Sequence, residues 1–471
     1  MQKTVVLIWS WIDIEKDSIP LQIQDTRTPL WALALGTYLK EKVPNVKIYI
    51  LDERIIDSRA IIKKINHLKP DIVRISLSYL NYEKSLMFAR KAKLLNAKVV
   101  FGGGYAAIFR KEIFKNRGPD SDDYCVDVII QRDGEKAFYE YFLGKPLDKI
   151  KNLVYQDETG IKENFIELLN LSNLPIPNRD LLDVKEYFNL DRIFFSKQGK
   201  QKLRCLNIYP HRGCWWRDKT GGCLFCSNLE KPLRLRNAKI FAKEIDILIL
   251  EYNVNHIIIE AEDFLGDIQW FKDFVKSYHP YFIKHTSSKS LPSLRISTRA
   301  DRITVKTVRM LKEVNVDRVF IGFESGDQEC LIAINKGISL KATIRAANLL
   351  NRYKIGLAAG FILGLPGETV KTLQKTLHLI KKISLLNYVG VVYLQTLTPL
   401  PSSPAWEMLI KKTGKIYKDK DIIDWNEVRK DWIKHFCNLK YQDIIGIKKE
   451  FKRLGRQQSR IQFVLFDEIK F

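Results

Sequence analysis

Short apolar runs alternate along the first 145 residues with longer segments in which apolar residues recur at helical spacing. The apolar runs lie at Val5–Trp11, Val46–Leu51, Asp71–Leu77, Lys98–Phe101 and Val126–Ile130, and helix-like segments such as Thr28–Leu39, Ser58–Leu68 and Tyr82–Leu95 fall between them. Alternating strands and helices predict a parallel sheet that is covered by helices. We therefore expect a doubly wound, Rossmann-like α/β domain, with any ligand at the carboxyl ends of its strands.

The same alternation returns in the second half of the chain. Its apolar runs lie at Ile208, Ile257–Ile259, Leu294–Ile296, Val319–Phe323, Leu357–Leu363 and Val389–Leu394. Six strand–helix units predict a partial (β/α)6 barrel, smaller than the full eight-stranded barrel. From Tyr417 onward, aromatic residues alternate with basic ones at helical spacing, and we expect a helical extension that packs as a cap over the barrel.

A proline-containing segment, Leu174–Leu182, separates the two halves. Prolines keep such a connection extended. We therefore divide the chain into residues 1–145, a linker over 146–200, the barrel over 201–405 and the helical extension over 406–471.

The composition indicates the cellular compartment and the class of partner. The chain has 471 residues, 7 cysteines and a formal net charge of +24. Few cysteines, three of them clustered, exclude a disulfide framework and indicate a reducing compartment. No apolar run approaches the ~20 residues that cross a bilayer and no signal peptide is recognisable, so we expect a cytoplasmic protein. Basic residues attract nucleic acid, but here they are spread along helices, and a solvated lysine-rich surface explains them equally well.

The clustered cysteines are Cys214, Cys223 and Cys226. Three thiolates can hold an iron–sulfur cluster and leave one iron open to a substrate, whereas four saturate it for electron transfer. The alternative is a structural zinc site, for which His211 or Cys205 would supply the fourth ligand. This segment alone leaves both interpretations open.

The cysteine loop resembles that of radical S-adenosylmethionine (SAM) enzymes, because Arg212-Gly213 precedes Cys214 and the aromatic Phe225 lies between the last two cysteines. The resemblance implies a [4Fe-4S] cluster on Cys214, Cys223 and Cys226 that binds SAM and cleaves it to a 5′-deoxyadenosyl radical. This loop departs from the family in its first gap, which has eight residues instead of three. The gap ends in Gly221-Gly222, which could turn the loop back sharply.

Four later segments strengthen this resemblance. Gly360–Glu368 matches the family's adenine motif, Gly-x-Ile-x-Gly-x-x-Gly-Glu, in every fixed position. Val319–Gly326 resembles its Gly-x-Glu-Ser-Gly strand, Leu294–Asp301 resembles its Thr-Arg-x-Asp strand, and His256–Phe264 occupies the place of its acidic strand end. The resemblance implies SAM contacts from Phe225, Arg299, Glu324, Ser325, Gly360, Ile362, Gly364, Gly367 and Glu368. We assign no catalytic residue beyond the cluster.

The strand ends of the first half resemble the cobalamin-binding domain that is fused to many radical SAM enzymes. The residues that carry this resemblance, and that it implies as cobalamin contacts, are Ser76, Ser78, Gly102, Gly103, Gly104, Tyr105, Gly134 and Glu135. The mutase-type Asp-x-His-x-x-Gly motif is absent, and no histidine precedes His67. A histidine from that motif therefore cannot ligate the cobalt, and a domain that had lost cobalamin would look the same.

The resemblance implies a cobalamin-dependent radical SAM enzyme that methylates an unactivated carbon. Two alternatives stay open: a radical rearrangement, cyclisation or epimerisation with a cobalamin-free first domain, and an RNA-binding or RNA-modifying protein. The latter is not favoured, because methylthiotransferases of RNA carry extra N-terminal cysteines, whereas only Cys125 lies there. We expect a small-molecule or peptide substrate and a reducing partner such as flavodoxin or ferredoxin.

Overall fold

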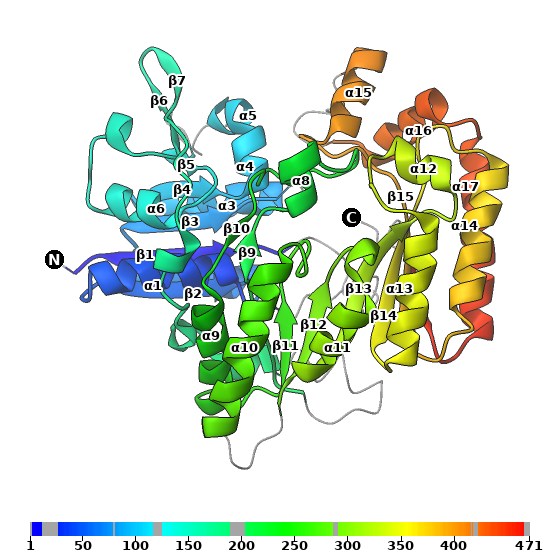
Figure 1. The fold of residues 1–471 in the computed structure, drawn as a ribbon. Helices are drawn as coiled ribbons and strands as arrows, with labels where there is room; N and C mark the ends of the chain where they lie inside the picture. Colours follow the sequence, from blue (N-terminus) through cyan, green and yellow to red (C-terminus); the bar gives the residue numbers. More distant parts are fainter. Residues whose placement is uncertain are drawn as a thin grey trace. The chain divides into compact units, whose positions relative to one another are not determined.

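The computed structural model describes residues 2–11, 27–78, 81–115, 125–188, 203–285, 291–415, 417 and 423–465, with only the backbone described at 279–285. The described residues fold as two compact units, one that ends at residue 188 and one that begins at residue 203. Each unit contains its own sheet (Figure 1).

The first unit is built on a seven-stranded sheet of order β2-β1-β3-β4-β5-β6-β7. Its strands are β1 Thr4–Trp9, β2 Lys47–Asp52, β3 Ile72–Ser76, β4 Lys98–Gly102, β5 Val128–Ile130, β6 Leu153–Asp157 and β7 Gly160–Glu163. The first five pair in parallel, and β6 and β7 add an antiparallel hairpin at the edge. The order 2-1-3-4-5 is a doubly wound topology, so the predicted fold of this half is confirmed.

Helices connect these strands, namely α1 Leu30–Lys42, α2 Ser58–Leu68, α3 Tyr82–Lys93, α4 Gly104–Ile108, α5 Arg110–Lys115 and α6 Glu135–Phe142. Strands that are buried on both faces read as continuous apolar runs, and Val5–Ile8 of β1 are all fully buried. Local capping fixes helix starts, as where the Asp57 carboxylate accepts the Ala60 amide at the start of α2. One hydrophobic core of this unit lies between the sheet and the pair α1 and α6.

The second unit is built on a seven-stranded sheet that is parallel throughout, of order β16-β15-β14-β13-β12-β11-β8. Its strands are β8 Cys205–Ile208, β11 His256–Ile259, β12 Ser293–Ser297, β13 Val316–Glu324, β14 Gly356–Leu363, β15 Val389–Thr396 and β16 Gln462–Leu465. A short antiparallel pair, β9 His211–Arg212 and β10 Arg234–Leu235, stands beside it. The six predicted barrel strands follow one another in sequence order, which confirms the partial barrel.

The helices of this unit are α8 Trp215–Thr220, α9 Ala238–Leu250, α10 Ile268–His285, α11 Val305–Glu313, α12 Gln328–Ala333, α13 Leu340–Arg352, α14 Val370–Ile383, α15 Pro404–Thr413, α16 Trp425–Phe436 and α17 Tyr441–Gln457. α11, α13 and α14 follow one another along the outside of the sheet (Figure 1). Thr304 and Thr369 form capping boxes at the starts of α11 and α14, as expected for helices that begin just after a strand end.

The C-terminal region is helical, as predicted, but it also completes the barrel sheet. α16 and α17 pack on each other and α17 packs on α14, and the chain then enters β16, which pairs in parallel with β15. This seventh strand was not predicted, because Gln462–Leu465 is short and follows a basic helix.

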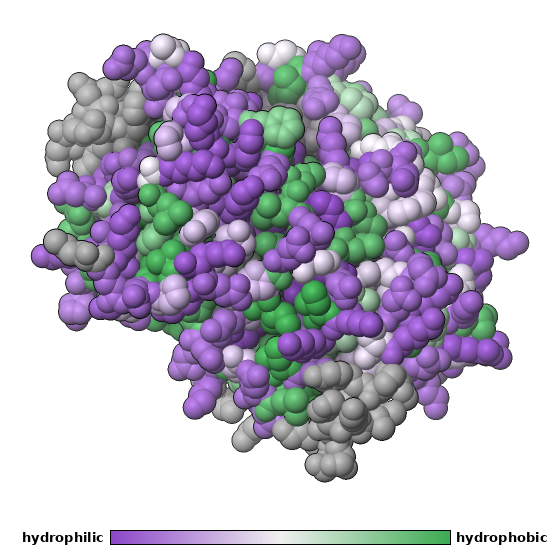
Figure 2. All heavy atoms as spheres, turned by 60° about the vertical axis from the view of Figure 1, so that its left-hand side comes forward, coloured by the Kyte–Doolittle hydropathy of each residue, from purple (hydrophilic) through white to green (hydrophobic). Residues whose placement is uncertain are grey.

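On the face drawn in Figure 2, polar side chains predominate, with apolar areas between them. None of the helices among the described residues is long and apolar enough to span a bilayer.

Phe451 on α17 tests whether the C-terminal region is part of the barrel fold. Its ring is fully buried and meets Phe463 of β16 edge to face, with 5.0 Å between ring centroids. We expect Phe451→Ala to lower the free energy of unfolding by about 3–5 kcal/mol in urea titrations. Ile445→Ala, on the same helix at 38 % exposure, is the control and should cost under about 1 kcal/mol. Similar losses in both variants would contradict the packing described here.

Candidate functional site

The long gap between the first two cysteines is folded, not extended. Cys214 stands at the N-terminus of α8, and the helix ends at Gly221, which has a left-handed φ of 83°. Gly222 follows with φ 92°, so both glycines make the turn that the sequence predicted. The guanidinium of Arg217 on α8 donates to the carbonyl of Cys226 at 3.1 Å, which ties the inserted helix to the end of the loop.

The three thiols share one electrostatic environment. Burial raises the pKa of Cys214, and it raises the pKa of Cys223 to about 11. The charge of Cys226 acts on both, so the three sulfurs lie within electrostatic range of one another. All three side chains are partly exposed, which leaves them open to an incoming metal that would displace their protons. Among the described residues, no three His, Cys, Asp or Glu side chains are placed to hold a single metal ion.

Glu324 ends β13 in a strained conformation beside the cysteines. Its φ is +59°, uncommon for a residue other than glycine, and its strand slips register with β14 at this point. A side chain at Gly322 would overlap the Glu324 carboxylate, which explains the glycine two residues before it. Glu324 Oε1 lies 2.7 Å from Nζ of Lys336, and both side chains are nearly buried.

Lys336 joins several of the predicted residues and was missed by the sequence reasoning. Its ammonium lies 5.9 Å from the centre of the Phe225 ring, and its charge lowers the pKa of Cys223, against the larger effect of burial. The Lys336–Glu324 ion pair therefore stands between the cysteine loop and the end of β13. The chain has 78 lysine and arginine residues, and nothing in the sequence distinguishes Lys336 from the others.

Arg299 follows β12 and connects the inserted helix to the same loop as Lys336. Its Nη2 donates to the carbonyl of Lys336 at 2.8 Å, and its Nε bonds to Asp301 at 3.1 Å. The guanidinium lies 4.4 Å from the centre of the Trp216 ring on α8. The structure thus brings Cys223, Phe225, Arg299 and Glu324 together and gives Arg299 protein partners, and their contact with SAM stays a prediction.

The acidic strand end after β11 also reaches this edge. Oδ1 of Asp263 accepts the hydroxyl of Thr298 at 2.6 Å and the amide of Arg299 at 3.3 Å. Burial raises the pKa of Asp263 and lowers that of the neighbouring His211 to about 4. His211 is therefore neutral at pH 7, and its Nε2 lies 3.2 Å from the Asp263 carbonyl.

The Gly360–Glu368 segment forms a closed turn between β14 and α14. Gly360 and Ile362 are buried in β14, while Gly364 and Gly367 have φ of +80° and +72°. Oε2 of Glu368 accepts the amides of Gly364 at 2.5 Å and Leu365 at 3.2 Å, so this carboxyl group holds the turn together. Nearby, the Ser325 hydroxyl lies 3.2 Å from that of Thr376 and accepts the Asp327 amide at 3.1 Å. Glu368 and Ser325 thus have structural partners, and their contact with SAM stays a prediction.

The C-terminal region fixes the outside of this turn. The indole N–H of the fully buried Trp432 donates to the Gly364 carbonyl at 2.8 Å. The Gly367 amide bonds to the Phe436 carbonyl, and the Asn438 amide bonds to the Glu368 carbonyl, both at 2.8 Å. A side chain at Gly364 would run into Ile433. α16 therefore holds the glycine-rich turn, a contact that the cap prediction did not specify.

In the first unit, the predicted cobalamin residues gather at one edge of the sheet. Ser76 ends β3 and pairs with Gly102 at the end of β4, and Gly134-Glu135 begins α6 after β5. Ser78 donates its amide to Asn81 at 2.7 Å, and Tyr105, just after Gly104 at the start of α4, stacks on Phe109 at 4.3 Å between ring centres.

Two of the glycines at this edge are explained by the protein itself. A side chain at Gly102 would overlap the guanidinium of Arg74, and one at Gly103, with φ +101°, would lie 2.7 Å from the Leu77 carbonyl. The requirement for glycine at both positions therefore does not depend on a planar ligand, and their contact with cobalamin stays a prediction.

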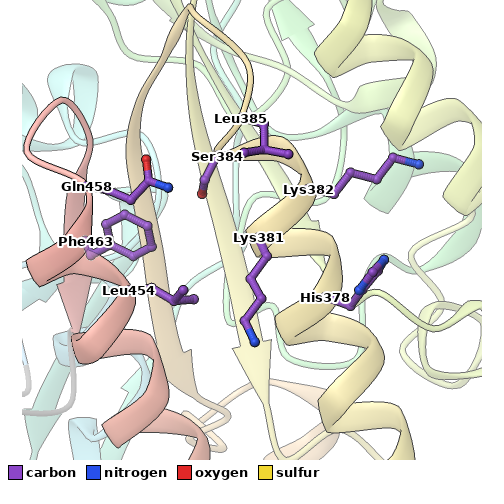
Figure 3. Close-up of a pocket in the computed structure, with 8 residues that line it drawn as sticks. All are labelled: His378, Lys381, Lys382, Ser384, Leu385, Leu454, Gln458 and Phe463. Carbon is purple, nitrogen blue, oxygen red and sulfur yellow. The ribbon is translucent and has the colours of Figure 1, made fainter.

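A surface pocket of about 390 Å³ lies elsewhere, between the end of α14, the end of α17 and β16 (Figure 3). It is lined by His378, Lys381, Lys382, Ser384, Leu385, Leu454, Gln458 and Phe463, with none of the predicted site residues among them. The pocket lies at the opposite end of α14 from Glu368, so it does not belong to the glycine-rich turn.

Glu368 offers a pH test of this turn. Burial raises the pKa of its carboxyl group to about 8, so between about pH 5 and 8 the folded state holds a proton that the unfolded state releases. The stability of the wild type should therefore fall as pH rises through this window. Relative to it, Glu368→Gln should gain up to about 1.4 kcal/mol per pH unit in urea titrations.

The exposed Glu407 supplies the control, as Glu407→Gln. Its stability relative to the wild type should not change over the same window. A flat or falling difference for Glu368→Gln would show that Glu368 is ionised in the fold.

Comparison with known proteins identifies the second unit. Residues 208–380 match the family model described as the Radical SAM superfamily. An uncharacterized methyltransferase of Pyrococcus horikoshii is 26 % identical over 76 % of this chain and 75 % of its own length. The 4′-phospho-dehydrooxetanocin synthase of Priestia megaterium is 24 % identical over 74 % of this chain, which spans only 49 % of that enzyme.

Two solved structures share this fold. The cobalamin-dependent SAM radical enzyme OxsB, solved with aqua-cobalamin and SAM, matches 97 % of this chain with a TM-score of 0.69 at 18 % identity, and 67 % of it is covered. The radical SAM methyltransferase TsrM of Kitasatospora setae, solved with cobalamin and a [4Fe-4S] cluster, matches 89 % with a TM-score of 0.68 at 14 % identity, and 76 % of it is covered. At these identities the likeness establishes the fold, and it confirms the predicted architecture.

Proposed function

We propose that this chain, a member of the radical SAM superfamily, is a cobalamin-dependent methyltransferase that acts on an unactivated carbon. The observation that carries the proposal is the combination of a radical SAM domain with a doubly wound domain whose serine and glycine residues gather at its strand ends. Enzymes with this fold have been solved with cobalamin, SAM or a [4Fe-4S] cluster bound.

Cys214, Cys223 and Cys226 would hold the cluster. Their partial exposure and mutual electrostatic range fit a cluster that bridges three thiolates, and the Arg217–Cys226 bond closes the loop around them. When bound, the cluster with SAM supplies a 5′-deoxyadenosyl radical, and cobalamin supplies a carrier for the methyl group.

The residues around the cysteines would orient SAM. The Glu324 carboxylate and Lys336 ammonium offer one charge of each sign beside Cys223, which suits the amino and carboxylate groups of an amino acid. The turn held by Glu368 and Trp432 would present its backbone to the adenine. These groups are positioned by the fold before any cofactor arrives, which lowers the entropy cost of binding.

We further propose a small-molecule substrate, a reducing partner such as flavodoxin or ferredoxin, and a cytoplasmic location. The reductant would deliver one electron to the cluster for each SAM cleaved. The partly exposed cysteines leave an approach for it.

Two products can be measured without knowing the substrate. Reconstituted protein should release 5′-deoxyadenosine from SAM in the presence of a reductant, and with cob(I)alamin and methyl-labelled SAM it should move the labelled methyl group onto cobalamin. Cys226→Ser should lose 5′-deoxyadenosine production by at least about a hundredfold, since the cluster would lack a ligand. Mass spectrometry of both products makes the measurement.

The control is Cys125→Ser, at a buried cysteine of the first unit. It should retain both products. If the protein produces 5′-deoxyadenosine but does not label cobalamin, it is a radical SAM enzyme and the proposed dependence on cobalamin is refuted. Neither product from the wild type, despite a full complement of iron, would refute the proposal.

A further inference from the structure

Arg74, in β3 of the first unit, is a buried cation with unused hydrogen-bond donors. Arg74 is 6 % exposed, and its Nε and Nη1 have no hydrogen-bond partner among the described residues. Its guanidinium lies 4.5 Å from the centre of the Trp31 ring, whose own buried N–H is also unpaired in the described part of the chain. Buried donors are nearly always paired in folded proteins, so this group of three needs an explanation.

The charge of Arg74 makes the missing partners more costly. Burial lowers its pKa to about 10, with Glu135 acting in the opposite direction, so the guanidinium remains protonated at neutral pH. A buried cation without hydrogen-bonding partners destabilises a fold substantially.

Arg54, in the same unit, is also stacked on a tryptophan, so its hydrogen bonds can be compared with those of Arg74. Its guanidinium lies 3.9 Å from the centre of the Trp9 ring, and its Nε also donates to Asp52 at 2.9 Å. Stacking on a tryptophan is therefore common to both arginines, but only Arg54 has a carboxylate bonded to its Nε among the described residues of the unit.

Arg74 also lies where a ligand of this fold would bind. It shares a face of β3 with Ser76, one step from the carboxyl end, and its guanidinium occupies the space left by the missing side chain of Gly102. Gly134 lies beside it, and Trp31 and Glu135 belong to the first turns of α1 and α6. In a sheet of order 2-1-3-4-5, ligands bind outside the carboxyl ends of the strands, at the topological switch point between β1 and β3.

We propose that Arg74, through Nε or Nη1, its two nitrogens without a hydrogen-bond partner in the described part of the chain, donates a hydrogen bond to an oxyanion of the ligand at these strand ends, namely the phosphodiester in the nucleotide tail of cobalamin. A guanidinium N–H makes a strong, charge-assisted hydrogen bond to a phosphate oxygen. This inference rests on the proposed cobalamin binding and adds a recognition residue to it. It explains why the fold keeps a buried cation beside Ser76 and Gly102.

Cobinamide, which has the corrin ring but lacks the nucleotide and its phosphate, makes the inference testable. Dissociation constants for hydroxocobalamin and for cobinamide would be measured by absorbance titration of the anaerobic full-length protein. The wild type should bind cobalamin at least about tenfold more tightly than cobinamide, and Arg74→Gln should weaken cobalamin binding about 10- to 100-fold while leaving cobinamide binding unchanged. Arg74→Lys, which keeps the positive charge but not the guanidinium, should bind cobalamin with an affinity between those of the wild type and Arg74→Gln.

The matched control is Arg110→Gln, which removes a more exposed arginine of the same unit that pairs with Glu163. It should bind both corrinoids as the wild type does. Without ligand, Arg74→Gln should have a melting temperature at least equal to that of the wild type, because it removes a buried charge of which two nitrogens lack a hydrogen-bond partner among the described residues; a lower one would indicate a purely structural role and overturn the inference.

Equal weakening of both corrinoids, or no weakening of either, would also overturn it. A third outcome would overturn it as well. If cobalamin and cobinamide bind the wild type equally, and inorganic phosphate raises the melting temperature of the wild type but not of Arg74→Gln, the site binds free phosphate. If the wild type binds neither corrinoid, the proposed cobalamin dependence fails first, and this outcome is distinct from the loss of discrimination alone.

Discussion

Parallel pairing of strands is the constraint on which both candidate sites depend. Because β8 and β11–β16 all run the same way, their carboxyl ends meet at one edge, and Arg299, Glu324 and the turn after β14 reach it from different parts of the sequence. The same constraint brings Ser76, Gly102 and Gly134 to one edge of the first sheet. Side chains far apart in the chain can therefore act on one ligand without any long loop to position them.

Within the barrel, the inserted helix α8 and the C-terminal helix α16 hold the site from two directions. Trp216 on α8 packs against Arg299 and would overlap any side chain at Gly337, next to Lys336. Trp432 on α16 packs on the glycine-rich turn. Both contacts replace flexibility with fixed geometry, since a loop of eight residues and a turn with two left-handed glycines would each have many conformations alone. The unusual cysteine spacing is thus compatible with an ordered cluster loop.

The central strands of both sheets and the residues at their ends could be predicted from the sequence, because a strand buried on both faces is a continuous apolar run and the motifs at its end are local. Other features could not. β16 is four residues long and follows a basic helix; Lys336 is one lysine among many until the fold sets it against Glu324; Arg74 lies within an apolar run and acquires significance only from partners it lacks among the described residues. Each depends on contacts between residues that are distant in sequence. The roles of the individual site residues toward cluster, SAM and cobalamin likewise remain predictions, since they depend on ligands as well as on the fold.

The central claim is that two cofactor domains act in one enzyme, and metal content tests it most directly. Protein purified without oxygen from cells supplied with cobalamin would be analysed for iron, cobalt and zinc per chain. The account predicts about four iron and about one cobalt per chain, the composition of one [4Fe-4S] cluster and one corrinoid. Zinc with little iron would contradict it, because the three cysteines would then belong to a structural zinc site.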